Sequence, residues 1–299
     1  MQTSPWLQIG LKQIGQLSMP KKTKCMLFGP NSSSPPLPFP LKIAGEEIER
    51  IGYRFNTKSF KLVGIQLDDS LDWNEHARYV RAKVARTNFA LARAKKLLPQ
   101  HIKLMVYNSL FKCHIEYCLP IWGGCSASLK RGFLNMQKKA ARNISLGKYN
   151  SHTDPLFRKY KILKFEDLYQ INCGVFMFNL SIGTHPSTIS ELVTKSANFD
   201  RNLEYIVTNL PYAYLKKQAP HSLVLVWNSL NIALRNWLKE NHKQRAKNIT
   251  ANPIVISQGL NYKLNEFRLK GFKSTLQDTL VLRYSSNVNC SNSYCNDCN

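Results

Sequence analysis

Two groups of residues have types and spacings that could hold a metal ion, and the first is a group of carboxylates. Asp68 and Asp69 are adjacent, and Asp72 follows three positions later. Two-metal catalysis needs carboxylates that converge from a rigid scaffold onto ions about 3.5–4 Å apart. Here the aspartates follow a short apolar run and lead into a helical pattern, a context that does not favour catalysis. We expect a structural role, in which Asp72 caps the helix that begins near Trp73.

Cysteines near the C-terminus form the second group. Cys290, Cys295 and Cys298 have a spacing like that of a zinc knuckle. A structural zinc ion takes four ligands, and the nearest histidine, His242, lies 48 residues before Cys290. Two interpretations stay open: a knuckle whose fourth ligand is cut off or comes from another chain, or free thiols on a mobile, Ser- and Asn-rich tail over residues 285–299.

Other signatures of catalysis are absent from the sequence. There is no glycine-rich phosphate loop and no G-x-S-x-G turn. The seven histidines show no pairing of the kind that metal ligands have. The sequence therefore predicts no catalytic residue, no small-molecule substrate and, apart from zinc at the tail, no cofactor in this chain.

Basic residues are the dominant chemical feature. The 299 residues include 42 Lys and Arg against 18 Asp and Glu, a formal net charge of +24. Between residues 76 and 153, Glu116 is the only acidic residue among 15 basic ones, so this stretch contributes +14. Solvated helical surfaces usually mix both signs, because Glu–Lys pairs stabilise them. One-sided charge of this density favours a nucleic acid as partner over a merely basic exposed face.

Three helices are predicted to position these charges. In residues 78–98 one helical face carries Val80, Val84, Thr87, Leu91 and Leu98, and the opposite face carries Arg78, Arg86, Arg93 and Lys96. A second helix is predicted over residues 101–118, ended by Pro120, and a turn at Gly123 and Gly124 follows. A third helix over residues 129–144 places Leu129, Phe133, Gln137, Ala140 and Ile144 on one face and its basic residues elsewhere. Together they predict a compact bundle with basic outer surfaces.

The flanking regions complete an α+β, mainly α fold. Residues 24–28 and 61–67 predict strands, and residues 41–51 could add a hairpin. Helices are predicted to begin at Glu166 and Asp167 and to span residues 222–240. The expected division is a small β region in residues 1–70, a basic helical domain in 71–150, a helical region in 151–284 and the tail in 285–299.

Composition also bears on location. The longest uninterrupted apolar stretches have five or six residues, which predicts no membrane span and no membrane partner. The first 17 residues lack the apolar core of a secretory signal. Five of the eight cysteines lie in apolar segments, as expected for free thiols in a reducing compartment. We expect a protein of the nucleus or cytoplasm that is not secreted.

Several segments in chain order resemble one known family, the reverse transcriptases of non-LTR retrotransposons of the jockey/CR1-like type. The matching segments are residues 17–28, which are similar to motif D of the palm; 61–68, similar to the primer-grip motif E; 71–76, similar to the start of the thumb; and 107–123, 137–142, 152–157, 163–169, 226–230 and 272–276, similar to C-terminal motifs. The resemblance extends over almost the whole chain. It implies that the β region is the remnant of a polymerase palm and that the basic helices form a thumb.

The resemblance also implies that the catalytic centre is missing. In this family the Mg²⁺-binding aspartates lie in motif A and in a Tyr-x-Asp-Asp turn, both upstream of motif D. Only 21 residues precede Lys22, and none of them is Asp or Glu. Asp68 and Asp69 follow the primer grip, so they do not correspond to the catalytic pair. The chain is therefore expected to be a truncated copy without polymerase activity of its own.

The resemblance to this family also implies roles for individual residues. Lys22 matches the motif D lysine, which assists the departing pyrophosphate, and residues 62–64 match the primer grip, which holds the primer end. The helices over residues 78–98 and 129–144 match the thumb, which follows the minor groove and backbone of the template–primer duplex. The expected contacts with RNA and DNA are Lys22, Lys61, Gly64, Arg78, Arg81, Arg86, Arg93, Lys96, Lys138, Lys139 and Arg142.

Three functional interpretations stay open. The chain could be a reverse-transcriptase fragment that works only within a larger element. It could be a stand-alone, non-enzymatic helical protein that binds RNA or DNA without regard to sequence. It could also be an inactive relic that retains only the fold.

Overall fold

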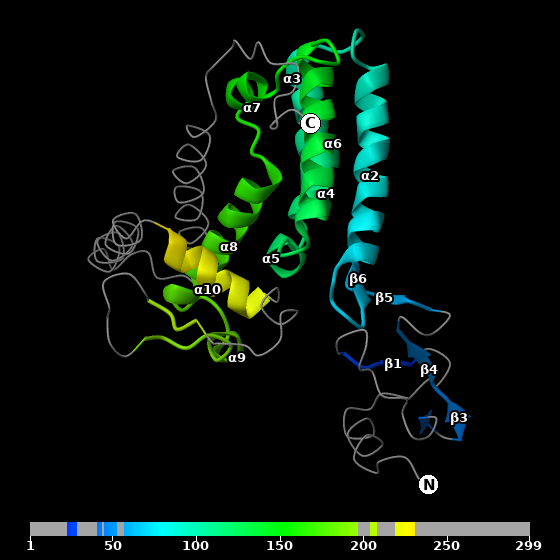
Figure 1. The fold of residues 1–299 in the computed structure, drawn as a ribbon, viewed down its shortest axis with the longest axis vertical. Helices are drawn as coiled ribbons and strands as arrows, with labels where there is room; N and C mark the ends of the chain where they lie inside the picture. The colour runs from blue at the N-terminus through cyan, green and yellow to red at the C-terminus, as the bar shows by residue number, and fades with distance from the viewer. Residues whose placement is uncertain are drawn as a thin grey trace, which may run out of the picture. The chain divides into compact units, whose positions relative to one another are not determined.

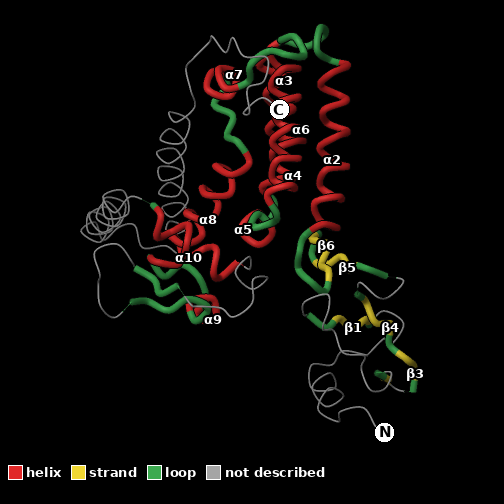
Figure 2. The backbone as a smooth tube through the Cα atoms, in the orientation of Figure 1, coloured by secondary structure: helices red, strands yellow, loops and turns green. Residues whose placement is uncertain are grey.

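A computed structural model describes residues 23–28, 41–43, 45–52, 57–196, 204–207 and 219–230. Helices dominate this part of the chain, and the strands lie near its N-terminal end (Figures 1 and 2). The α+β, mainly α fold class is thus confirmed at this level. The chain divides into two compact units, Met1–Tyr79 and Val80–Asn299, which are described separately below.

The described part of the first unit contains short strands that pair two by two. The strands are β1 (Lys24–Met26), β2 (Lys42–Ile43), β3 (Glu46–Glu47), β4 (Glu49–Ile51), β5 (Ser59–Leu62) and β6 (Ile65–Asp68). β1 pairs with β4 in parallel, and the pairs β2–β3 and β5–β6 are antiparallel. Lys24 Nζ lies 2.8 Å from Glu49 Oε2 across the parallel pair and lowers the pKa of Glu49. The predicted strand beginning at Lys24 and the predicted hairpin within residues 41–51 are both present.

Residues 61–67 form part of a hairpin, so the prediction of a single strand was wrong. Leu62 faces Ile65, and the two residues between them, Val63 and Gly64, have φ values of 46° and 86°. Two successive positive φ values are those of a type I′ turn, which suits a tight hairpin. The turn was missed because a β-branched valine rarely adopts this conformation and the apolar run has no break in composition.

The helices begin with α2 (Asn74–Arg93), which starts in the first unit and continues into the second. After it come α3 (Gln100–Val106), the π-helical segment η2 (Tyr107–Lys112), α4 (Cys113–Glu116), α5 (Leu119–Trp122), α6 (Ala127–Ser145), α7 (Asp154–Lys159), α8 (Phe165–Ser181), α9 (Ser187–Ser190) and α10 (Ala219–Ser229). All three predicted bundle helices are therefore present, the second as the consecutive segments α3, η2 and α4.

Two helix ends differ from the prediction. α2 ends at Arg93 and is followed by turns, so Leu98, predicted to lie in the core, is 37% exposed. The helical pattern stops here because of a contact with another part of the chain. The buried Lys103 side chain donates a hydrogen bond to the Lys95 carbonyl, which lies just after the end of α2. α4 ends before Cys118, whose φ is 50°, whereas Pro120, the predicted stop, lies in the first turn of α5.

The core of the second unit forms where the patterns predict it. α6 buries Phe133, Gln137, Ala140 and Ile144, as predicted, and α8 carries Glu166 and Asp167 in its first turn. The ring centroids of Trp122, Phe133 and Phe165 lie 5.1–5.5 Å apart. Gln137 Nε2 donates hydrogen bonds to Tyr107 Oη (3.2 Å) and to the Leu163 carbonyl (2.9 Å). This core fixes the helices that carry the basic residues.

Candidate nucleic-acid interface

α2 and α6 run side by side in the same direction, and polar side chains of α2 connect the two helices (Figure 1). Asn88 Nδ2 donates to the Met136 carbonyl at 3.0 Å. Two turns earlier on α2, the Arg81 guanidinium lies against Gly132, with Cζ 3.6 Å from the position that a Cβ atom would take there. Asn88 and Arg81 are seven positions apart and therefore lie on the same face of α2, so this face packs against α6.

The far end of this helix pair is held by two lysines. Lys95 Nζ donates to the Gly147 carbonyl at 2.7 Å, just beyond α6. Lys103 is 2% exposed, and its Nζ lies 3.0 Å from the Lys95 carbonyl oxygen and 3.5 Å from that of Asn143. Burial, together with the charge of Lys95, lowers the pKa of Lys103. These two lysines are structural, although the sequence gives them the same weight as the other basic residues.

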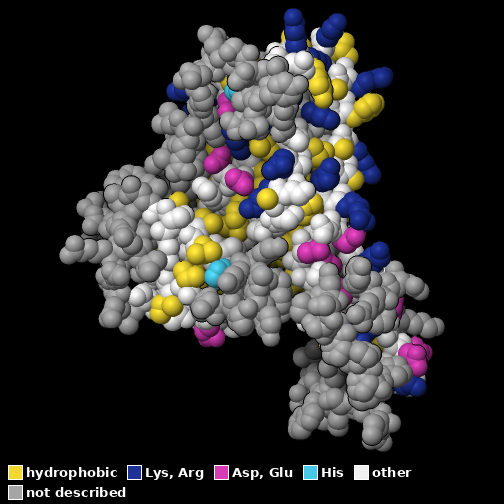
Figure 3. Space-filling model, in the orientation of Figure 1, with side chains coloured by type: hydrophobic (Ala, Val, Ile, Leu, Met, Phe, Trp, Pro, Cys, Tyr) yellow, Lys and Arg dark blue, Asp and Glu magenta, His cyan; other side chains and the backbone are white. Residues whose placement is uncertain are grey.

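Four exposed basic residues form what we call the basic surface. They are Arg86 and Arg93 on α2, Lys96 in the turns that follow α2, and Lys139 on α6. Figure 3 shows Lys and Arg side chains along the edge formed by α2, with hydrophobic side chains between them. Arg86, Arg93 and Lys96 are exposed opposite the buried Val80, Val84 and Leu91, as the periodicity predicts.

The acidic residue of this stretch does not neutralise the basic surface. Glu116 Oε1 lies 3.6 Å from Lys112 Nζ, one turn earlier along the chain. Half-buried ion pairs of this kind are local, and their charges largely cancel at a distance. The charge of the basic surface is therefore left for an external polyanion. Backbone phosphates fit such a surface because they need positive charge rather than base-specific contacts.

Two predicted contact residues on α6 are less accessible than expected. Lys138 is 3% exposed, and we exclude it from the contact set because a buried ammonium cannot reach a phosphate. The cause is that α6 is buried over a wide arc that includes Ala141 as well as the predicted apolar face. Arg142 is half-buried, and its Nε donates to the Ser151 carbonyl at 2.9 Å.

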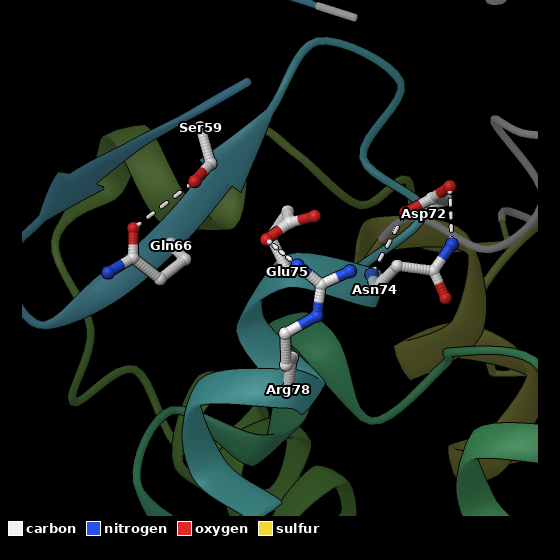
Figure 4. Close-up of polar contacts among 6 residues, drawn as sticks. All are labelled: Ser59, Gln66, Asp72, Asn74, Glu75 and Arg78. Carbon is white, nitrogen blue, oxygen red and sulfur yellow. Dashed lines mark hydrogen bonds and ion pairs between the residues drawn. The ribbon is translucent and has the colours of Figure 1, made fainter. Parts of the chain in front are cut away.

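The predicted residues of the first unit lie on separate elements. Lys61 is exposed on β5, with Nζ 5.3 Å from the centroid of the Tyr79 ring, and Gly64 completes the hairpin turn. Arg78 is exposed and forms an ion pair with Glu75 at 3.1 Å (Figure 4). Lys22 lies outside the described residues.

The three aspartates organise the chain just before α2. Asp68 Oδ1 accepts hydrogen bonds from Ser70 Oγ and from the Asp72 backbone N–H, both at 3.0 Å. Asp72 in turn accepts from the backbone N–H of Asn74 at 2.9 Å and from its side-chain amide at 2.7 Å (Figure 4). Burial, with a smaller effect of the Asp72 charge, raises the pKa of Asp68. These contacts agree with the structural role expected from the sequence.

Among the described residues, no three His, Cys, Asp or Glu side chains cluster closely enough to hold a metal ion. Cys290, Cys295 and Cys298 lie outside the described residues, so zinc binding at the tail stays a prediction. In the part of the chain that the structure covers, no helix combines the length and the apolar character that crossing a bilayer requires.

Two exposed aromatic rings lie beside arginines and were not predicted from the sequence. Phe89 is 67% exposed, and the Arg93 guanidinium lies 5.8 Å from its ring centroid. The available signal was the spacing of four residues, which brings the two side chains together on a helix. Tyr149 has a similar neighbour in Arg142, at 6.0 Å, which no spacing rule indicates because Tyr149 lies beyond the end of α6.

Comparisons of the chain with protein-family models, with curated protein sequences and with solved structures found no match.

Proposed function

We propose that this chain binds the sugar–phosphate backbone of nucleic acid through the basic surface, without reading its sequence. The observation that carries the proposal is the exposure of Arg86 and Arg93 on α2, Lys96 in the turns after it and Lys139 on the adjacent α6, while the acid of this stretch, Glu116, is paired with Lys112. Each phosphate neutralised by such a side chain releases condensed counterions, which supplies sequence-independent affinity.

We further propose that the chain is the C-terminal part of a reverse transcriptase of the non-LTR retrotransposon type, and that its ligand there is the template–primer duplex. The support is the motif series in the sequence, of which residues 17–22 and 272–276 lie outside the described residues and two other segments fall on elements as follows. Residues 61–68 lie within the β5–β6 hairpin, and the exposed side chains of Leu62 and Val63 at its tip are accessible to a partner. Residues 137–142 lie on α6 and provide its hydrogen-bonded core contact, Gln137.

In this proposal the chain binds the duplex but does not extend the primer. The support comes from the aspartates before α2, because Asp68 and Asp72 are already engaged in hydrogen bonds of the turn. These hydrogen bonds to the backbone and side chains of the turn give the two carboxylates a structural role.

A stand-alone, non-enzymatic nucleic-acid-binding protein is the second candidate. The same basic surface favours it, since every residue of that surface belongs to the second unit. The two candidates differ in what they expect of the first unit. A thumb within a polymerase should lose preference for a primer end when the hairpin tip is changed, whereas a stand-alone binder should not.

The experiment that tests the proposal combines binding and activity in one sample. The full chain is mixed with a labelled RNA–DNA primer–template at several salt concentrations, with Mg²⁺ and deoxynucleotides present. We expect binding whose affinity falls steeply with salt, and no primer extension. Primer extension would refute the non-catalytic role, and an absence of salt-dependent binding would refute the nucleic-acid function.

A second measurement, on a variant of the β5–β6 hairpin, distinguishes the reverse-transcriptase fragment from the stand-alone binding protein. The variant Val63→Asn keeps the turn, because asparagine accepts a positive φ, but removes the apolar tip. Reverse-transcriptase ancestry predicts a loss of the preference for a recessed primer end over a blunt duplex. An unchanged preference would favour the stand-alone protein.

A further inference from the structure

Two aromatic rings of the second unit are exposed, and each of them lies beside an arginine. Phe89, on α2, is 67% exposed, and Tyr149, after α6, is 79% exposed. The Arg93 guanidinium lies 5.8 Å from the first ring centroid, and the Arg142 guanidinium lies 6.0 Å from the second. These are cation–π distances, so each ring is presented together with a positive charge.

The rings are held by ordered parts of the fold. Phe89 lies inside α2, one residue after Asn88, whose side chain donates to the Met136 carbonyl at 3.0 Å. The loop of Tyr149 is tethered on both sides of the ring. Lys95 Nζ donates to the Gly147 carbonyl at 2.7 Å, and Arg142 Nε donates to the Ser151 carbonyl at 2.9 Å. Positioned rings lose little conformational entropy when a ligand stacks on them.

A third cation–π pair differs from these two because its aromatic ring is buried. The Lys130 ammonium lies 5.6 Å from the Tyr169 ring centroid, but Tyr169 is buried among the helices. A buried ring of this kind contributes to packing and cannot meet a ligand. The Phe89–Arg93 and Tyr149–Arg142 pairs each leave most of the aromatic side chain in solvent, where a ligand can reach it.

The ligand that fits both halves of such a pair is an unpaired nucleotide. A base stacks on an aromatic ring with an affinity gain of about 1–3 kcal/mol by alanine substitution, whatever its identity. The neighbouring guanidinium can then neutralise the adjacent phosphate. In a duplex both faces of each base are already stacked, so an exposed ring gains nothing from it.

We propose that Phe89 with Arg93 and Tyr149 with Arg142 are stacking platforms for the bases of single-stranded nucleic acid. This inference rests on the proposed phosphate-binding function and specifies its substrate class. The basic surface holds the backbone, and the two rings bind unpaired bases, which in a template–primer are those of the template strand beyond the duplex.

The test compares three probes of equal length on the full chain: single-stranded oligothymidylate, the same strand with abasic sugars, and a DNA duplex. Oligothymidylate and the abasic strand carry the same phosphates, so a difference between them measures stacking. The variant is Phe89→Ala with Tyr149→Ala. The control is Leu97→Ala, which removes an exposed apolar side chain from the segment after α2 without removing a ring.

We expect oligothymidylate to bind at least about 25-fold more tightly than the abasic strand, because each of the two rings contributes about fivefold or more. The affinity of the double variant for oligothymidylate should fall by about fivefold or more for each ring removed. This factor corresponds to the lower end of the measured stacking energies. The double variant should bind the duplex as tightly as the wild type does. Its affinity for the abasic strand and its salt dependence should stay unchanged, because no phosphate contact is removed. Leu97→Ala should behave as the wild type, and tryptophan at positions 89 and 149 should preserve the preference.

The outcomes separate this inference from the function on which it rests. Equal binding of oligothymidylate and the abasic strand, with a steep salt dependence, would overturn the stacking platforms and leave phosphate binding intact. A preference for oligothymidylate over the abasic strand that the double variant retains, or an equal loss of affinity for the duplex in that variant, would also overturn them. If none of the three probes binds, both the inference and the proposed function fail.

Discussion

Acid should destabilise this protein through one buried histidine, His76, in the first turn of α2. Its side chain is 1% exposed, and its Nδ1 accepts a hydrogen bond from the Gln66 backbone N–H at 3.3 Å. An accepting nitrogen carries no proton, so this geometry requires the neutral ring. Burial lowers the pKa of His76 from 6.5 to about 4 in the folded protein.

The sign and size of the effect follow from this shift. As pH falls below 6.5 the unfolded chain takes up a proton at His76, while the folded chain does so only near pH 4. The unfolded state is therefore favoured increasingly between these two values, and stability is unaffected by His76 above about pH 7.5. At pH 5 the loss amounts to about 2 kcal/mol of the free energy of unfolding, and it approaches about 3 kcal/mol below pH 4.

The assay is urea unfolding at pH 7.5 and at pH 5.0 for three proteins. The wild type should lose about 2 kcal/mol more than His76→Leu between the two pH values. His101→Leu is the control, because His101 is exposed on α3, and it should lose as much as the wild type. If His76→Leu loses as much stability as the wild type, the buried neutral histidine does not cause the acid sensitivity.

Two further predictions concern the second unit. Gln137→Leu removes two buried side-chain hydrogen bonds. In urea titrations it should lower the free energy of unfolding by about 2–4 kcal/mol. The control Asn135→Leu, at an exposed position of the same helix, should change the free energy of unfolding by less than about 0.5 kcal/mol. Leu146→Gly should raise it by up to about 1 kcal/mol, because this exposed residue after α6 has φ 62°. The same change at Leu97, which is exposed but not left-handed, should give no gain, and equal effects at both positions would contradict the conformational argument.

Regular periodicity explains how much of the fold could be predicted. On α6, Phe133, Gln137, Ala140 and Ile144 recur at helical spacing, and all four are buried. On α2 the same reasoning gave the buried and the exposed faces. Such patterns succeed because a helix with one apolar stripe must bury that stripe, whatever else surrounds it.

The failures arise where other parts of the chain decide the outcome. Lys138 is buried because α6 is packed over a wide arc, which composition cannot indicate. The turn at Val63 is imposed by the pairing of β5 with β6 against the preference of valine. Lys103 bonds carbonyls at two helix ends that are far apart in the sequence, so its structural role is invisible before folding. In each case the deciding contact is non-local.

The outer face of α2 is proposed to contact phosphates, and the salt dependence of binding to an RNA–DNA hybrid is the measurement that tests this contact. Each phosphate contact contributes about 0.7–0.9 to the slope of log affinity against log salt. Arg86→Ala with Arg93→Ala should therefore make the slope shallower by about 1.4–1.8. Arg158→Ala with Lys159→Ala removes the same charge from exposed positions on α7 and should leave the slope unchanged. An unchanged slope in the α2 variant, or equal changes in both variants, would contradict the account.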